Sequence, residues 1–353
     1  MNSLRMFPVF LAISMVLVVT IGCALSGQGS EGDEAIPTVN NTKVATSEVL
    51  PTTVDTPKPA VEETEEPVEP PTSTIPPPTE PPSALTPCYD EICTTSGSFL
   101  LARPIGPSGR YVVDPSYRFG ELGRGRREPH HGVYFLNSLG TPVIAAASGE
   151  VVVAGDDHSK VYGTYPYRYG NLVIIKHDLG ILSEPVYTLY AHLSEIMVEE
   201  GDFVEKGQEI GLAGMSGDIA GSTLHFEVRL GENSLPAVRN PELWLENLTD
   251  EDDQMQGALA GRVVNKRGDI LLIPSFVIER LGGPGQPALE TYYIDSYKDK
   301  RLAGLAPWEE SFALGDLPAG SYQITFLRNN ITHQREVEVQ PGQLTFVAFQ
   351  IDE

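Results

Sequence analysis

The 353-residue sequence has few cysteines, few tryptophans and few basic residues. It contains only three Cys and two Trp, and its 24 Lys and Arg face 48 Asp and Glu, which gives a formal net charge of −24 at pH 7. A protein that grips a phosphate backbone needs a basic face, so this balance excludes a nucleic-acid binder. Three cysteines are also too few for a Cys-based zinc site. The length leaves room for two or three domains.

Long apolar runs are scarce, and the clearest one lies near the N-terminus. Arg5 precedes an apolar run from Phe7 to Ile21, which is shorter than the ~20 residues that a comfortable membrane span needs. This pattern predicts a signal peptide over residues 1–23. Thr20-Ile-Gly-Cys23 resembles a bacterial lipobox, although Leu is usual at the first position, and it predicts that Cys23 carries lipid. An ordinary signal peptide and a short uncleaved anchor remain alternatives.

The segment 24–87 lacks aromatic residues and is rich in Pro, Thr, Ser and Glu. This composition cannot build a packed core, so we expect a disordered linker with polyproline character. At ~3.1 Å per residue, a tether of ~60 residues reaches on the order of 180 Å. The predicted tether is long enough to carry a domain from a membrane surface into a wall layer.

Two cysteines follow the linker. If Cys23 is lipidated, Cys88 and Cys93 are left as an even pair in an exported protein, where a disulfide persists. We therefore predict a Cys88–Cys93 disulfide, with two free thiols as the alternative.

The remaining sequence is typical of a mainly β protein. Runs rich in Val and Ile, bounded by Gly, predict strands, while no helical periodicity of any length competes. We expect strands at 100–105, 141–147, 149–153, 171–177 and 186–192, a short helical turn at 240–245, and a loop inserted beside a groove at 156–169. His177, at the end of an apolar strand, is expected to be structural.

After the acidic stretch 250–253, the tail predicts a separate small β-sandwich over 256–353. Strands are expected at 261–265, 270–279, 289–293, 322–326, 335–339 and 344–350. The turns within 317–322 and 339–344 resemble those of transthyretin-like modules, so a transthyretin/Ig-like fold is expected there.

Three histidine-containing stretches stand in a fixed order: Pro129-His-His-Gly-Val-Tyr-Phe135, Leu189-Tyr-Ala-His-Leu-Ser194 and Ser222-Thr-Leu-His-Phe-Glu-Val228. A glycine-rich run, 201–211, lies between the last two. This order and spacing resemble the LytM/lysostaphin-type zinc metallopeptidases (metallopeptidase family 23, duplicated hybrid motif fold), which cut peptide cross-bridges in bacterial cell walls. The resemblance covers 111–248 and implies a LytM-like antiparallel β-sheet or β-sandwich domain at 88–249.

The resemblance also implies roles for single residues. The family motif is His-x-Gly-x-Asp, then Tyr-x-His, then His-x-His-Phe, so His130 and His225 match zinc ligands and His192 matches a catalytic histidine. Two positions depart from it, because Tyr134 stands in place of the Asp ligand and Thr223 in place of a catalytic histidine.

These departures change the expected chemistry. A catalytic zinc site offers three protein ligands and one water, and Tyr134 completes the three only as a phenolate, whose free pKa is ~10. Thr223 and His225 lie two apart on a strand and share a face. A threonine hydroxyl cannot replace a titrating imidazole near neutral pH.

The leading hypothesis is therefore a lipid-anchored envelope protein with a degenerate LytM-type domain, whose groove binds peptidoglycan peptides or regulates a cell-wall hydrolase. The alternative is an active zinc metalloendopeptidase that cleaves peptidoglycan cross-links with Tyr134 as third ligand. Zinc is the cofactor that the resemblance implies, weakly held or absent. A pure scaffold without a groove ligand is a third hypothesis. The locally positive loop 123–127 is expected either to dock an acidic polymer or to be a plain solvated loop.

Overall fold

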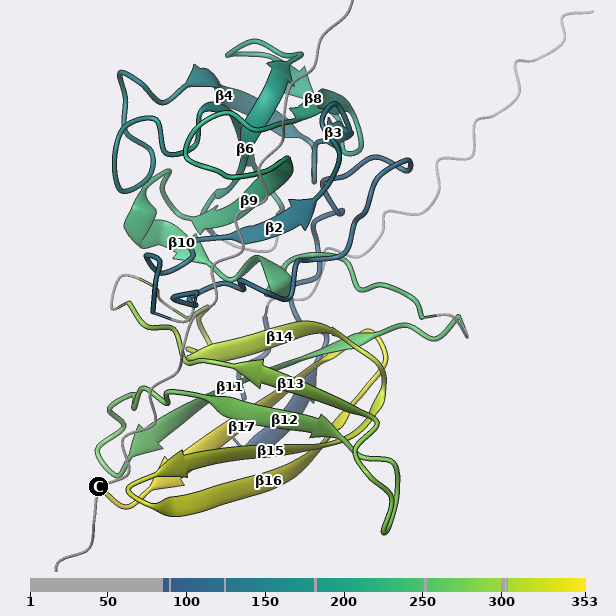
Figure 1. The fold of residues 1–353 in the computed structure, drawn as a ribbon, viewed down its shortest axis with the longest axis vertical. Coiled ribbons are helices and arrows are strands. Elements are labelled where there is room, and N and C mark those ends of the chain that lie inside the picture. Colours follow the sequence, from purple (N-terminus) through teal and green to yellow (C-terminus); the bar gives the residue numbers. More distant parts are fainter. Residues whose placement is uncertain are drawn as a thin grey trace, which may run out of the picture. The chain divides into compact units, whose positions relative to one another are not determined.

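The structure, a computed structural model, describes residues 85–88, 90–123, 125–180, 183–250, 253–299, 302 and 304–353. The predicted signal peptide, Cys23 and the linker as far as residue 84 lie outside the described residues. The described chain is nearly all β, as the sequence predicts, and folds into three sheets (Figure 1). Its described helices are two single turns, η1 (Leu235–Ala237) and η2 (Pro241–Leu243). No helix of the described part is long and apolar enough to cross a membrane.

The central sheet has nine strands, and every pairing in it is antiparallel. Its main order is β10-β9-β6-β5-β4-β7, with β2 bonded to β9 and with β8 bonded to both β6 and β3. The strands are β2 (Val133–Leu136), β3 (Pro142–Ile144), β4 (Gly149–Asp156), β5 (Asn171–His177), β6 (Val186–Ile196), β7 (Phe203–Val204), β8 (Glu209–Ala213), β9 (Thr223–Leu230) and β10 (Val238–Arg239).

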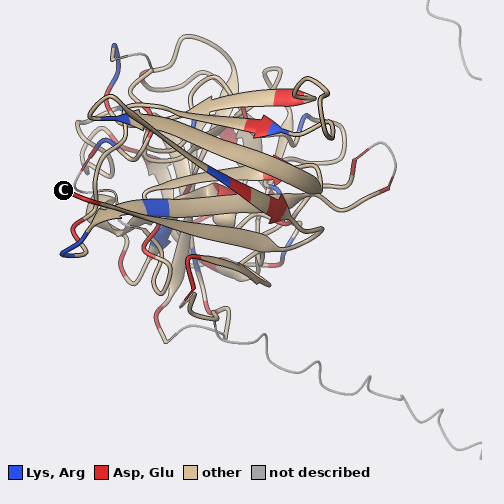
Figure 2. Ribbon diagram, turned by 90° about the horizontal axis from the view of Figure 1, so that it is seen from below, with Lys and Arg blue, Asp and Glu red and all other residues tan. Residues whose placement is uncertain are grey.

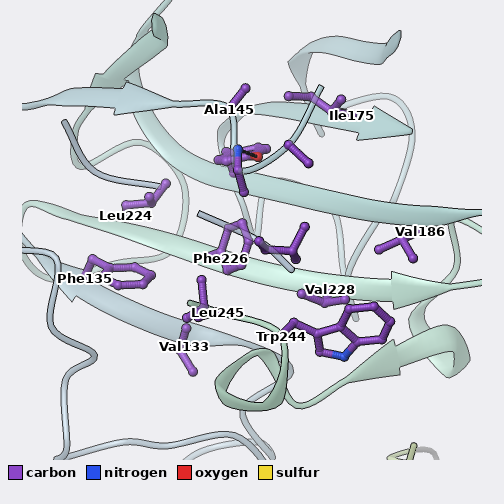
Figure 3. Close-up of a cluster of buried hydrophobic side chains, with 14 of the residues drawn as sticks. Val133, Phe135, Ala145, Ile175, Val186, Leu224, Phe226, Val228, Trp244 and Leu245 are labelled. Atoms are coloured by element: carbon purple, nitrogen blue, oxygen red, sulfur yellow. Dashed lines mark hydrogen bonds between the residues drawn. The ribbon is translucent and has the colours of Figure 1, made fainter. Parts of the chain in front are cut away.

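The core of this sheet is built by alternation along β2 and β9. Val133 and Phe135 of β2 and Leu224, Phe226 and Val228 of β9 are all completely buried on one side of the sheet. Figure 3 shows these side chains gathered with Trp244 and Leu245, which follow η2. Because successive side chains of a strand point to opposite faces, this apolar set fixes which residues face the other way.

The predicted helical turn at 240–245 is confirmed by η2. Asn240 precedes it, and the Asn240 side-chain oxygen accepts a hydrogen bond from the backbone N–H of Glu242 at 3.0 Å. Pro241 occupies the first position, where a missing N–H costs nothing. The turn places Trp244, with 0% of its surface exposed, in the core.

The tail forms two four-stranded sheets. One has the order β1-β17-β11-β14 and the other β13-β12-β15-β16, and buried residues of both share one core cluster. The strands are β1 (Ile92–Thr95), β11 (Gly257–Asn265), β12 (Phe276–Arg280), β13 (Glu290–Ile294), β14 (Phe312–Leu317), β15 (Gly320–Arg328), β16 (Ile331–Val339) and β17 (Leu344–Ile351). The transthyretin/Ig-like character of this part stays a prediction.

The segment before the central sheet differs from expectation. The predicted strand at 100–105 is wrong, because Leu101 and Ile105 make only isolated bridges, to Leu245 and Val143. The predicted domain 88–249 also contains β1, but β1 pairs with β17 of the tail. The largest apolar cluster likewise joins Phe226 to Ala258 and Phe346 of the tail sheets. The boundaries 88–249 and 256–353 therefore stay predictions, with β1 belonging by hydrogen bonding to the tail.

Candidate functional site

The face of β9 opposite the core carries four polar residues, Thr223, His225, Glu227 and Arg229. Their exposed fractions are 2%, 2%, 0% and 0%. Polar groups removed from water must find hydrogen-bond partners, or their burial costs free energy. The partners of these four residues therefore define the site.

His225 faces His130 across the site. His130 Nδ1 lies 2.7 Å from the carbonyl oxygen of Tyr117, and His225 Nε2 lies 3.0 Å from a carboxylate oxygen of Glu227. Each of these nitrogens therefore donates a hydrogen, which leaves the other nitrogen of each neutral ring with a bare lone pair. Those two nitrogens, His130 Nε2 and His225 Nδ1, lie 3.2 Å apart. Two bare lone pairs at that distance repel unless a proton or a cation lies between them.

The spacing of this pair fits two ligands of one metal ion. Two nitrogens bound at 2.0–2.1 Å to a tetrahedral zinc ion lie roughly 3.3 Å apart, and outer partners such as Tyr117 O and Glu227 are the kind that orient ligating histidines. Two ligands do not complete a site, however. Among the described residues, no group of three or more His, Cys, Asp and Glu side chains is placed to hold a metal ion. The residues present thus fit only part of a zinc site.

Tyr134 occupies the position beside this pair. It lies on β2 directly opposite His225 of β9, and its ring centroid is 4.4 Å from that of His130 and 5.3 Å from that of His225. Burial raises the pKa of the Tyr134 phenol above its ordinary value of 10.0. The side chain is therefore a neutral hydrogen-bond donor at neutral pH rather than an anionic ligand.

His192 reaches the site through an irregularity of β6. The register between β5 and β6 shifts between Asn171/Leu193 and Val173/Tyr190, so β6 carries one extra residue there. His192 has a positive φ of 64°, a conformation that non-glycine residues seldom adopt. Its Nδ1 lies 2.9 Å from the carbonyl oxygen of Ser216, and its ring centroid is 5.8 Å from that of His225. A β-bulge that re-aims a side chain is a common feature beside functional sites.

Thr223 takes part in the backbone instead of the histidine cluster. Its hydroxyl lies 3.0 Å from the carbonyl oxygen of Phe135 on the neighbouring strand and donates to it. The hydroxyl has no hydrogen-bond contact with His192 or His225 among the described residues. The structure thus brings His130, Tyr134, His192 and His225 together. Thr223 lies on the same face of β9, but its hydroxyl bonds to the backbone of β2.

A buried network behind His225 was not predicted from the sequence. Glu227 accepts hydrogen bonds from the Tyr169 hydroxyl, from His225 and, at 2.9 and 2.7 Å, from Nε and Nη2 of Arg229. The Arg229 guanidinium holds the pKa of this carboxyl well below its usual range, although burial opposes that shift. The network fixes the orientation of the His225 ring. The alternation Thr-x-His-x-Glu-x-Arg in β9 was the available signal.

A groove of about 550 Å³ opens over Tyr134 and Thr223. Its lining contains three arginines and three carboxylates, which are Arg126, Arg127, Arg168, Asp114, Glu128 and Asp218. Arg168 comes from the loop predicted to lie beside the groove, but sequence reasoning did not single it out. Its positive charge helps to lower the pKa values of His130, His192 and His225, for which burial is the largest cause. The pKa of His192 falls to about 3.

Outside the groove, the structure joins Cys88 and Cys93 in a disulfide, with a Cα–Cα distance of 5.9 Å that suits such a bond. His177 has both ring nitrogens engaged, by Ser148 O at 2.9 Å and by the Thr188 hydroxyl at 2.7 Å. Full satisfaction of a buried ring agrees with the structural role that the sequence predicts for it.

The sequence model of peptidase family M23 matches residues 128–236. The chain is 35% identical over 140 residues to the peptidoglycan DD-endopeptidase ShyB of Vibrio cholerae, covering 37% of this chain and 29% of that protein. It is 38% identical over 108 residues to the uncharacterized lipoprotein YgeR of Escherichia coli, covering 31% of this chain and 38% of that protein.

Among solved structures, the catalytic domain of lysostaphin from Staphylococcus simulans is 30% identical, with a TM-score of 0.29, over 39% of this chain and 85% of that chain. The chain spans less than two fifths of the length of the two curated relatives. The family match includes His130, Tyr134, His192 and His225. It confirms the predicted family: residues 128–236 form a peptidase family M23 domain.

Proposed function

We propose that this M23 domain is catalytically degenerate and uses its groove to bind peptides of the bacterial cell wall, or to regulate a cell-wall hydrolase, at the cell envelope. The family match and a relative named as a peptidoglycan DD-endopeptidase support a role at the cell wall. A cleft with a few convergent polar groups is the usual form of a binding site. The groove over Tyr134 has this form.

The observation that carries the proposal is the incomplete donor set around His130 and His225. Tyr134 offers a phenol whose pKa is raised by burial, and the Thr223 hydroxyl is engaged by a backbone carbonyl. Catalysis by a metal-bound water needs both a complete ligand set and groups that position the water.

The first test measures zinc content and cleavage with four proteins: the unmodified full chain, Tyr134→Asp, Thr223→His and the double variant. We expect the unmodified protein to hold little zinc and to cleave neither peptidoglycan nor oligoglycine peptides. Tyr134→Asp restores a carboxylate ligand and is expected to raise zinc occupancy with little cleavage. Thr223→His alone is expected to give neither. The double variant is expected to give stoichiometric zinc and measurable cleavage, strongly more than the sum of the single changes, because residues that act as a unit are non-additive.

The alternative is an active zinc endopeptidase with Tyr134 as its third ligand. Its supporting observation is the placement of the Tyr134 ring 4.4 Å from the ring of His130. Tight zinc binding and wall cleavage by the unmodified protein, both lost in Tyr134→Phe, would establish this enzyme and overturn the binding proposal. A chain that neither cleaves nor binds any wall peptide or hydrolase would instead be a scaffold.

We also propose that Cys23 anchors the chain to a membrane through lipid. The residue lies outside the described part, and the support comes from the Gly-Cys ending of the apolar run and from a relative named as a lipoprotein. Acyl chains contribute about 0.8 kcal/mol per buried CH₂, whereas an acidic chain has no affinity of its own for an anionic membrane surface. Cys23→Ser is expected to move the protein from the membrane fraction to the soluble fraction. Unchanged fractionation would exclude the lipid anchor.

A further inference from the structure

We propose that the groove recognises the free carboxylate of a peptide, held between Arg127 and Arg168 with the Tyr134 hydroxyl as an additional donor. This inference rests on the proposed binding function and names the chemistry of the bound group.

The carboxylates of the groove already have partners. Asp114 accepts from the Ser116 backbone N–H at 3.0 Å and from the Ser116 hydroxyl at 2.9 Å. Glu128 accepts from the Thr164 hydroxyl at 2.7 Å. Asp218 accepts a hydrogen bond from the hydroxyl of Tyr165. These acids accept from neutral donors, and among the described residues only Asp218 forms an ion pair with a groove arginine, 3.8 Å from Arg168.

Two arginines of the groove lack the carboxylate partner that most arginines in the described part of the chain have. Arg262, Arg328 and Arg335, for example, each lie within 3.0 Å of a carboxylate. Basic and acidic residues, blue and red in Figure 2, both occur along the described strands. Among the described residues, neither Arg126 nor Arg127 has such a carboxylate. In a chain with a formal net charge of −24, two guanidinium groups that line a groove without a carboxylate partner leave a place for an external anion.

A stack of rings holds Arg127 in place. Its guanidinium carbon lies 4.9 Å from the centroid of the Tyr117 ring, and Tyr117 stacks on His130 with centroids 4.2 Å apart and planes 5° from parallel. Tyr117 is itself only 3% exposed and donates its hydroxyl hydrogen to the carbonyl of Glu128. A guanidinium that lies over an aromatic ring is attracted to the ring face and still has N–H groups free to bind a planar partner. The contact with Tyr117 thus keeps Arg127 at the groove, where it can donate to a carboxylate.

Arg168 is the second fixed donor. Its side chain is 14% exposed and lies 2.8 Å from the Tyr165 hydroxyl. Tyr134 lines the same groove as Arg127 and Arg168. Its hydroxyl has no hydrogen-bond partner among the described residues. A carboxylate is the group that would accept from two guanidiniums and a phenol together.

The expected occupant is a peptide with a free terminal carboxylate. The site offers guanidinium groups beside the rings of Tyr134 and Tyr165, and aromatic rings suit peptide groups next to the carboxylate. A polymer that carries phosphate groups is also an anion that guanidinium groups bind. The experiment must therefore distinguish a peptide carboxylate from a phosphate.

The experiment uses the purified full chain and two probes, Nα,Nε-diacetyl-Lys-D-Ala-D-Ala and its C-terminal amide, in titration calorimetry. We expect the acid to bind at least tenfold more tightly than the amide, since hydrogen bonds to charged groups contribute about 1.5–3 kcal/mol. Arg127→Gln and Arg168→Gln are each expected to weaken binding of the acid about tenfold, and Tyr134→Phe by a few-fold, without changing binding of the amide. Arg267→Gln, an exposed arginine paired with Asp269 in the tail, is the matched control and should change nothing.

Three outcomes would contradict the inference. Equal binding of acid and amide would overturn the carboxylate site while leaving peptide binding intact. Binding of neither probe would contradict the proposed function together with this inference. Displacement of the acid by inorganic phosphate or polyphosphate at matched charge would overturn the peptide carboxylate in favour of a phosphate polymer. Because Arg127 is exposed, Arg127→Gln is expected to keep the fold. If Arg168→Gln does not fold, Arg168→Lys replaces it in the test and is expected to retain part of the affinity.

Discussion

The strand β9 has two buried faces that differ in chemistry. Leu224, Phe226 and Val228 lie on the face that joins the core, while His225 and Glu227 lie on the opposite face. On the core face, burial needs only complementary shape. On the polar face, each group needs a partner, and the partners of His225 and Glu227 are other buried polar side chains. One strand therefore carries both the stability of the sheet and its site.

The two faces show which buried polar groups have their cost of burial offset by hydrogen-bond partners and which do not. The Glu227 carboxylate is fully engaged by Tyr169, His225 and Arg229, so its burial is balanced locally. The facing lone pairs of His130 and His225, 3.2 Å apart, are not balanced by any group among the described residues. An arrangement that costs free energy and persists beside a groove residue, here Tyr134, is typical of a functional site.

The largest effect is expected on the core face. Phe226→Ala removes a completely buried ring that packs edge-to-face against Phe135 and Tyr190. The loss of burial and the cavity left behind are expected to lower the free energy of unfolding by about 3–5 kcal/mol. Urea denaturation of the full chain measures this change. The control is Phe203→Ala, because 71% of that side chain is exposed and its loss should change stability little. Equal losses in both variants would refute the assignment of the core face.

The polar face is expected to respond somewhat less, through charge instead of volume. Glu227→Gln keeps the shape but leaves the buried Arg229 guanidinium without its carboxylate. We expect a loss of about 3 kcal/mol, in the range for breaking a buried ion pair. Glu246→Gln is the control, since Glu246 pairs with Lys206 on the surface with side chains 49% and 46% exposed. If the two variants were equally stable, the buried network of Glu227 and Arg229 would contribute nothing to the free energy of unfolding.

The sequence was sufficient to predict most strands of the sheet that bears the site. The apolar run at 171–177 became β5 with the same bounds, and 186–192 became the first part of β6. Alternation is a local signal, so it survives in a single sequence. The predicted strand at 100–105 failed because its residues pair at only two isolated points, with partners far along the chain. β14 was missed because Phe312–Leu317 contains Gly315 and Asp316, which are poor strand formers.

The sequence predicted only those site residues that lie within a recognisable motif. The stretches around His130, His192 and His225 indicated the histidines that the fold brings together, and Tyr134 and Thr223 lie at the two departures from the motif. Arg168 and Tyr117 carry no sequence signal of their own, because their roles arise from stacking and from a loop that returns to the groove. Such contacts depend on tertiary geometry, which periodicity does not encode.

A pH titration tests His177, a buried histidine that lies apart from the pair His130 and His225. Burial lowers the pKa of His177 from its ordinary value of 6.5. The unfolded chain then binds a proton near pH 6.5 that the folded protein does not, so the free energy of unfolding is greatest above pH 6.5 and falls as the pH drops below it. His177→Gln removes this pH-dependent contribution. The free energy of unfolding, measured by urea denaturation, is therefore expected to fall less steeply between pH 7 and 5 in the variant. An unchanged slope would mean that His177 titrates normally in the folded protein.

The smallest effect is expected at Thr223, which lies on the polar face but bonds to the backbone. Thr223→Val keeps the shape and removes one hydrogen bond to the Phe135 carbonyl. That carbonyl still accepts from the Asn137 side chain at 3.3 Å, so no buried acceptor is left without a donor. We therefore expect a loss of about 0.5–1 kcal/mol in urea denaturation, and no change in the affinity for the carboxylate peptide. A peptide affinity that falls tenfold in Thr223→Val while stability holds would place the hydroxyl among the groove's contacts. The polar face of β9 would then reach its ligand through Thr223 as well as through Tyr134.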